Sequence, residues 1–207
     1  MIDNYLRRML EDPLDRCARI LDRSRITPDR ITALGLVLGL GSALSAGLQL
    51  WLLALALWIF SRLADGLDGP LARRRIRRGK PISGAGGFFD ITADFTVYGT
   101  TVVGVAVGAS SGYDAPWWPF LLVLLAYYIN GTAFLAFSSI AEKTDRKIDD
   151  GRSLSFLGGL AEGAETIAVH SLWLLLPQFG WQIAVVWAGV VTVSSGQRII
   201  AGYRALS

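Results

Sequence analysis

Long apolar stretches constrain the fold of this chain more than any other feature. A helix needs about 20 mostly apolar residues to cross the roughly 30 Å hydrocarbon core of a membrane. Residues 31–48 carry no charge, and five further stretches reach this length once weakly polar flanks are included. The sequence therefore predicts an all-α membrane protein with six transmembrane helices, at residues 29–48, 50–72, 87–110, 116–140, 155–177 and 181–202.

Composition limits the chain to one membrane domain. Its 207 residues are 52% apolar, which is too hydrophobic for an ordinary soluble domain, and the length is too short for several domains. We expect the domain to cover residues 29–207, preceded by a separate segment at residues 1–28.

Basic residues gather in alternate connections between the predicted helices. Seven Lys or Arg residues lie before or at the start of the first helix, six lie between the second and third, and four lie between the fourth and fifth. The opposite connections, at residues 49, 110–115 and 178–180, contain none. The positive-inside rule then places both termini in the cytoplasm, as in a protein of a prokaryotic inner membrane.

The tryptophans fall into two groups. An aromatic belt at the outer interface is expected from Trp51, Trp117, Trp118 and Trp181. The deeper Trp58, Trp173 and Trp187 are interpreted as lipid-facing or packing residues.

The first 28 residues have helical periodicity without a long apolar run. Apolar residues recur every three or four positions with Arg and Asp between them, and Pro13 is expected to break the helix in two. One interpretation is an amphipathic helix on the inner leaflet, where its arginines meet anionic lipid. The alternative is a helix packed on the cytoplasmic ends of the spans.

Four aspartates lie inside segments that otherwise read as membrane helices. Asp65 and Asp68 are three residues apart, and Asp90 and Asp94 are four apart, so each pair lies on one helix face. The second and third spans are predicted to be antiparallel neighbours whose acids face one another at the cytoplasmic end. Oxygen ligands of this kind suit Mg²⁺ or Mn²⁺, and two pairs have room for two ions. Ion pairing with Arg62, Arg73 or Arg74 is the alternative explanation.

The residues around these acids resemble the signature of the CDP-alcohol phosphatidyltransferase family, of the integral-membrane class I type. D-x-x-D-G-x-x-A-R is filled from Asp65 to Arg73, and G-x-x-x-D-x-x-x-D from Gly86 to Asp94. Residues 74–85, between the two halves, form a longer connection than is usual in the family, and we interpret it as a basic, Gly-rich turn.

This resemblance implies an enzyme of phospholipid biosynthesis that transfers a phosphatidyl group from CDP-diacylglycerol to a small alcohol and releases CMP. It implies that Asp65, Asp68 and Asp90 hold a metal pair, and that Asp94 shares a metal and acts as general base. The CDP moiety would be bound by Asp68, Gly69, Ala72, Arg73 and Gly86. The resemblance also favours a homodimer, and no nucleic-acid partner is expected.

The acceptor pocket is indicated less directly. Glu162 and Glu165 are predicted three apart on one face of the fifth span, where they would bind the acceptor or accept from neighbouring arginines. Arg198 would bind an acceptor phosphate or serve as a positive-inside anchor. Arg62, one turn before Asp65, would either balance charge or contact substrate. His170 is interpreted as a residue that packs or hydrogen-bonds between helices.

Three further alternatives stay open at this point. A CDP-choline or CDP-ethanolamine phosphotransferase would share the signature but use a lipid alcohol as acceptor. A cation transporter would use the intramembrane carboxylates as an ion path. The small residues Gly35, Gly39 and Ala43 would allow close helix contact either within the bundle or across a dimer.

Overall fold

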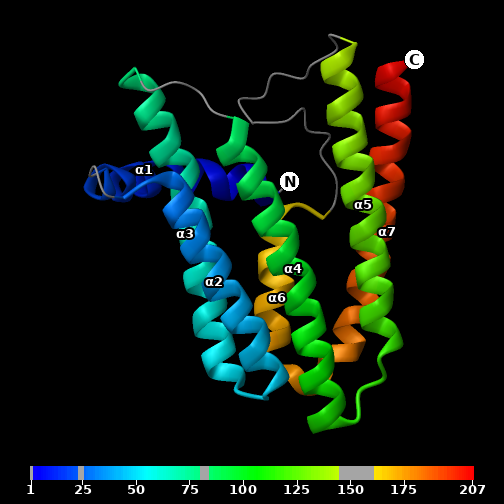
Figure 1. The fold of residues 1–207 in the computed structure, drawn as a ribbon. Helices are drawn as coiled ribbons and strands as arrows, with labels where there is room; N and C mark the ends of the chain where they lie inside the picture. Colours follow the sequence, from blue (N-terminus) through cyan, green and yellow to red (C-terminus); the bar gives the residue numbers. More distant parts are fainter. Residues whose placement is uncertain (1, 23–25, 80–83, 145–160) are drawn as a thin grey trace.

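The computed structural model describes residues 2–22, 26–79, 84–144 and 161–207, and all regular secondary structure in these residues is helical. The helices are α1 (Ile2–Leu21), α2 (Pro28–Gly47), α3 (Trp51–Arg77), α4 (Gly84–Tyr113), α5 (Trp118–Lys143), α6 (Gly163–Leu175) and α7 (Gly180–Leu206), with a short 3₁₀ turn at Pro177–Phe179. Figure 1 shows α2 to α7 running alternately up and down a bundle, while α1 lies across it near one end. We call this the α1 end, and the chain also finishes there.

Among the described residues, four helical segments are long and apolar enough to cross a membrane. They are α2, α4, α5 and the stretch Pro177–Leu206 that contains α7. The second half of α3 carries charges, and α6 has only 13 residues in the described part of the chain. Length and composition therefore support an all-helical membrane protein with four candidate spans.

Helix α2 is the element against which both α3 and α4 pack, and these two contacts are the most extensive between helices. No pairing of comparable extent joins α3 to α4 among the described residues. The two helices were expected to pack directly on each other. Instead, each of them packs mainly on α2.

Small residues allow this packing. A Cβ on Gly35 would lie 3.4 Å from the Ser61 carbonyl oxygen of α3, and one on Gly39 would lie 2.6 Å from Val97 of α4. At Gly104 the backbones of α2 and α4 approach so closely that a Cβ would lie 2.1 Å from the carbonyl oxygen of Ala43. The small-residue ladder of α2 therefore serves contacts within the bundle.

Large aromatic side chains fill the centre of the bundle. Trp58, Trp173 and Phe120 are almost completely buried, and Trp187 is 5% exposed. Of the two interpretations of the deeper tryptophans, packing is therefore confirmed. Trp51, Trp118 and Trp181 belong to the first turns of α3, α5 and α7, all at the end opposite α1 (Figure 1).

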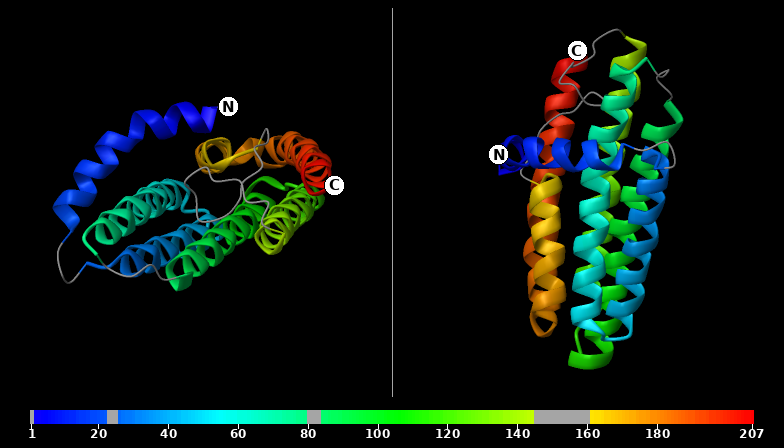
Figure 2. Two further views of the ribbon diagram at one scale, coloured as in Figure 1. Left: turned by 90° about the horizontal axis from the view of Figure 1, so that it is seen from above. Right: turned by 90° about the vertical axis from the view of Figure 1, so that its left-hand side faces the viewer.

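Helix α1 continues through Pro13, so the prediction of a break there is wrong. Figure 2 shows the helix crossing the bundle instead of running parallel to it. Ala18 is fully buried in a small cluster with Ile31, Ala64 and Leu71. Packing of α1 on the bundle is thus established, whereas its contact with a membrane stays a prediction.

Ion pairs reinforce this contact because α3 extends further than predicted. The helix continues to Arg77, so the arginines expected in a turn lie on its last turns. Asp15 pairs with Arg74 and Arg77, at 3.3 and 3.6 Å. Asp22 lies 2.6 Å from Arg78, which directly follows the helix. The long connection between the two halves of the signature therefore begins as helix, and residues 80–83 lie outside the described part.

The N-terminal boundary of α6 also differs from the prediction. Residues 161 and 162 are not helical, and α6 begins at Gly163, so Glu162 precedes the helix that was expected to carry it. Residues 155–160 of the predicted fifth span lie outside the described residues.

The close approach of α2 and α4 gives a stability prediction. We expect Gly104→Ala to destabilise the protein by about 1–3 kcal/mol, because the added Cβ forces the two backbones apart. The thermal unfolding midpoint in detergent should fall by several degrees. Gly99→Ala in the same helix is the control, since no atom lies within 4 Å of its Cβ position, and its midpoint should stay level or rise. Equal midpoints for both variants would contradict the packing described here.

Candidate metal and substrate site

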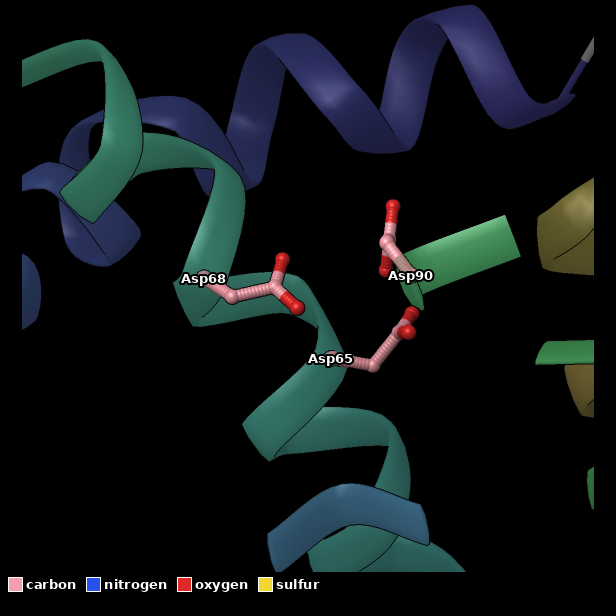
Figure 3. Close-up of side chains that lie close together, drawn as sticks. All are labelled: Asp65, Asp68 and Asp90. Atoms are coloured by element: carbon pink, nitrogen blue, oxygen red, sulfur yellow. The ribbon is translucent and has the colours of Figure 1, made fainter. Parts of the chain in front are cut away.

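Three carboxylates converge at the α1 end of the bundle. Asp65 and Asp68 project from α3, and Asp90 projects from α4 toward them (Figure 3). One oxygen from each lies within 4.8 Å of the others. We call Asp65, Asp68 and Asp90 the three-carboxylate cluster. Its donors are all hard oxygens from two rigid helices, which fits a cation such as Mg²⁺ or Mn²⁺.

A threonine of α2 holds one member of this cluster. Thr32 Oγ1 donates a 2.5 Å hydrogen bond to Asp68 Oδ2, and both side chains are buried. A hydrogen bond to a ligating carboxylate fixes the orientation of that carboxylate. Thr32 could not be predicted from the sequence, because it is 36 residues away from Asp68 and belongs to no recognisable spacing.

The fourth aspartate is held differently. Asp94 lies one turn after Asp90 on α4, but it is not a member of the three-carboxylate cluster. Its Oδ1 accepts a 2.7 Å hydrogen bond from Arg62 Nη1, which also lies 3.7 Å from Asp65 Oδ2. Of the two roles considered for Arg62, the structure supports balancing of charge, since its side chain is only 6% exposed.

An aromatic layer packs against Arg62 on the side away from the acids. It consists of Trp58, Tyr98, His170 and Trp173. Arg62 Cζ is 5.1 Å from the Trp58 ring centroid and 5.0 Å from that of Tyr98, within the range of a cation–π contact. Trp58 stacks on His170 with centroids 4.9 Å apart, and His170 is equally close to Trp173. Trp58, His170 and Trp173 are fully buried and Tyr98 is partly buried, so the layer joins Arg62 to the apolar core.

His170 has the role expected for it. Its ring is completely buried, and its Nε2 lies 2.9 Å from the hydroxyl of Tyr127 on α5. Trp187 of α7 donates to the same hydroxyl. His170 is therefore confirmed as a residue that hydrogen-bonds between helices.

The remaining signature residues surround the cluster at the cytoplasmic ends predicted for α3 and α4. Arg73 is exposed and folds back along its helix, so that a Cβ on Gly69 would lie 3.3 Å from its Nη1. Ala72 is half-buried on the same turn. Gly86 lies in the first turn of α4, and a Cβ there would lie 3.2 Å from Asp29 Oδ1 of α2.

The three residues predicted for the acceptor pocket are found on two different helices. Glu162 is buried and immediately precedes α6, while Glu165 is half-buried in its first turn, so the two do not share a helix face. Arg198 of α7 is 6% exposed and donates to Asn130 Oδ1 of α5 at 3.1 Å. Arg198 thus lies inside the bundle and is not an exposed positive-inside anchor.

The arrangement of the acids and the match of a family model over most of the chain identify the family. The model of the CDP-alcohol phosphatidyltransferase family matches residues 25–194. The chain belongs to the CDP-alcohol phosphatidyltransferase family. Members of this family are phosphotransferases, so the protein is a membrane enzyme of phospholipid head-group transfer.

Two curated relatives of this phosphatidyltransferase support the assignment. Inner membrane protein YnjF of Escherichia coli is 36% identical over 96% of this chain and all of its own length. Archaetidylinositol phosphate synthase of Pyrococcus horikoshii is 30% identical over 69% of this chain and 77% of its own.

The fold is shared with a solved enzyme. Phosphatidylinositol phosphate synthase PgsA1 of Mycobacterium tuberculosis, with CDP-DAG bound, superposes with a TM-score of 0.73 over 94% of this chain and 96% of its own, at 20% identity. The same enzyme in complex with manganese and citrate gives a TM-score of 0.71 over 94% of this chain and 92% of its own, also at 20% identity.

The hydrogen bond from Thr32 gives a prediction for the phosphatidyltransferase. Replacement by the similarly shaped Val leaves Asp68 without its donor, and we expect Mn²⁺ affinity to fall about tenfold. The measurement is an electron paramagnetic resonance titration of the purified protein. Thr96→Val is the matched control, because Thr96 Oγ1 donates only within its own helix, to Thr92 O. A Thr32→Val variant with the affinity of the control would show that the bond does not orient a ligand.

Proposed function

We propose that this phosphatidyltransferase transfers the phosphatidyl group of CDP-diacylglycerol to the hydroxyl of a small polar alcohol and releases CMP. The observation that carries the proposal is the convergence of Asp65, Asp68 and Asp90, which each have one carboxylate oxygen within 4.8 Å of the others. Asp94 follows Asp90 by one turn of α4. This is the constellation needed to hold cations against a pyrophosphate and to place a base beside it.

The three-carboxylate cluster would hold Mg²⁺ or Mn²⁺, as two ions with Asp94 sharing one of them. When bound, the ions neutralise charge on the pyrophosphate oxygens. Asp94 would accept the proton of the acceptor hydroxyl. The new bond forms between the acceptor oxygen and the phosphorus next to the diacylglycerol, the phosphorus–oxygen bond to CMP breaks, and CMP leaves with the electron pair.

The CDP moiety would lie over the cytoplasmic ends of α3 and α4. Asp68, Gly69, Ala72, Arg73 and Gly86 would line it, with the Arg73 guanidinium as an exposed donor for the diphosphate. Glycines at two of these positions permit close approach of the nucleotide to the backbone.

The acceptor pocket is assigned to Glu162, Glu165 and Arg198. Two relatives are synthases of inositol phosphate lipids, so an inositol phosphate is the first acceptor to test. A buried arginine such as Arg198 suits a phosphate on the acceptor.

The arrangement in the membrane is part of the proposal. Six helices, α2 to α7, would span a bacterial inner membrane, with both termini and the site in the cytoplasm and with α1 on the inner leaflet. Residues 1–28 form the juxtamembrane segment and residues 29–207 the membrane domain, and the protein would act as a homodimer. The arginines at the end of α3 support this orientation.

The function is tested by supplying acceptors one at a time. Purified protein with CDP-diacylglycerol and Mg²⁺ or Mn²⁺ is incubated with glycerol 3-phosphate, serine, inositol or inositol phosphate, and lipid products are identified by mass. We expect metal-dependent CMP release with one of them. Activity only with diacylglycerol and CDP-choline or CDP-ethanolamine would support the alternative phosphotransferase. Metal flux into liposomes without nucleotide would support a transporter, against which the buried aromatic layer argues.

The role of Asp94 gives a second prediction. We expect Asp94→Asn to lower kcat by about 10²–10⁴-fold, because the amide cannot accept the proton of the acceptor. The control is Asp114→Asn, an exposed residue in the connection between α4 and α5 whose positive φ of 51° asparagine also adopts. CMP release by Asp94→Asn at the rate of this control would exclude Asp94 as the base.

A further inference from the structure

Arg62 is a buried cation that the proposed chemistry does not use. It precedes Asp65 by one turn of α3, and its side chain is 6% exposed. A buried guanidinium is retained only when it is paired and hydrogen-bonded, because desolvation of a charge is costly. The surroundings of Arg62 therefore indicate its task.

The guanidinium is fixed on the side that faces the bundle. Trp58 and Tyr98 each contribute a ring at about 5 Å. Nη2 donates a 3.1 Å hydrogen bond to Ser61 Oγ, and that hydroxyl donates to Gly35 O of α2 at 2.7 Å. A planar group held at its faces and at one nitrogen has one orientation.

In this orientation Nη1 is directed to the acids. It lies 2.7 Å from Asp94 Oδ1 and 3.7 Å from Asp65 Oδ2. The shorter bond engages one oxygen of Asp94. The Asp94 carboxylate also lies against that of Asp65, although it is not one of the three whose oxygens all lie within 4.8 Å of one another. Arg62 thus contacts the proposed base directly and one metal ligand more loosely.

We propose that Arg62 is a positioning residue that holds Asp94 at the edge of the three-carboxylate cluster, so that Asp94 shares only one ion and remains able to accept the acceptor proton. The inference rests on the proposed function for the role of the base. Without this cation, four carboxylates would face the bound ions, and Asp94 would turn toward them. Cation binding should then become tighter while turnover becomes slower.

These opposite signs distinguish positioning from a structural role, which would weaken both. In Arg62→Met we expect the Mn²⁺ dissociation constant, measured by paramagnetic resonance without substrate, to fall about three- to tenfold. We expect kcat for CMP release to fall about 100-fold, with KM for CDP-diacylglycerol within about twofold of the wild type. Arg75→Met removes a guanidinium whose side chain is 11% exposed and which donates to Ile26 O, and its Mn²⁺ affinity should be unchanged.

Arg62→Lys keeps the test decisive if Arg62→Met does not fold. Lysine retains the charge but lacks the planar fork, so we expect kcat to fall about tenfold with Mn²⁺ affinity near that of the wild type. Unchanged kcat in either variant, or weaker Mn²⁺ binding in Arg62→Met, would overturn the inference. A wild-type protein that releases no CMP with any acceptor would refute the proposed function instead, while the Mn²⁺ titration would still decide whether Arg62 restrains Asp94.

Discussion

Negative charge gathered at one end of an apolar bundle is the constraint on which the rest of the structure depends. Carboxylates in such a place need donors and counter-charges close by. The donor Thr32 comes from α2 and bonds to Asp68. The counter-charge Arg62 belongs to α3, and its partner Ser61 bonds to the α2 backbone at Gly35 O. The glycines that let α2 approach α3 and α4 therefore serve the site as well as the packing.

Features that depend on periodicity within one segment could be predicted from the sequence. Apolar runs gave the positions of the long helices, and the spacing of three and four residues placed Asp65 beside Asp68 and Asp90 near Asp94. The signature identified the family, which the match over residues 25–194 confirms. These features are local, so a single segment contains all of the information needed to recognise them.

What the sequence could not predict depends on contacts between distant segments. The hydrogen bond from Thr32 and the ion pair of Arg62 with Asp94 join residues more than 30 positions apart. The extension of α3 to Arg77 has the same origin, because acids on α1 stabilise its last turns as a helix. The late start of α6 at Gly163 was missed because apolar residues and glycines alone do not define a helix boundary.

Residues on the two sides of the aromatic layer differ in how freely they can be substituted. On the side of the layer that faces the acids, side chains such as Arg62 are fixed by hydrogen bonds and ion pairs. On the side of the layer away from the acids, residues such as Phe120 and Val123 contribute only volume to the packed core. A change in the length or packing of the helices on that side, of the kind that matches a bilayer of another thickness, would therefore leave the arrangement of the acids unchanged.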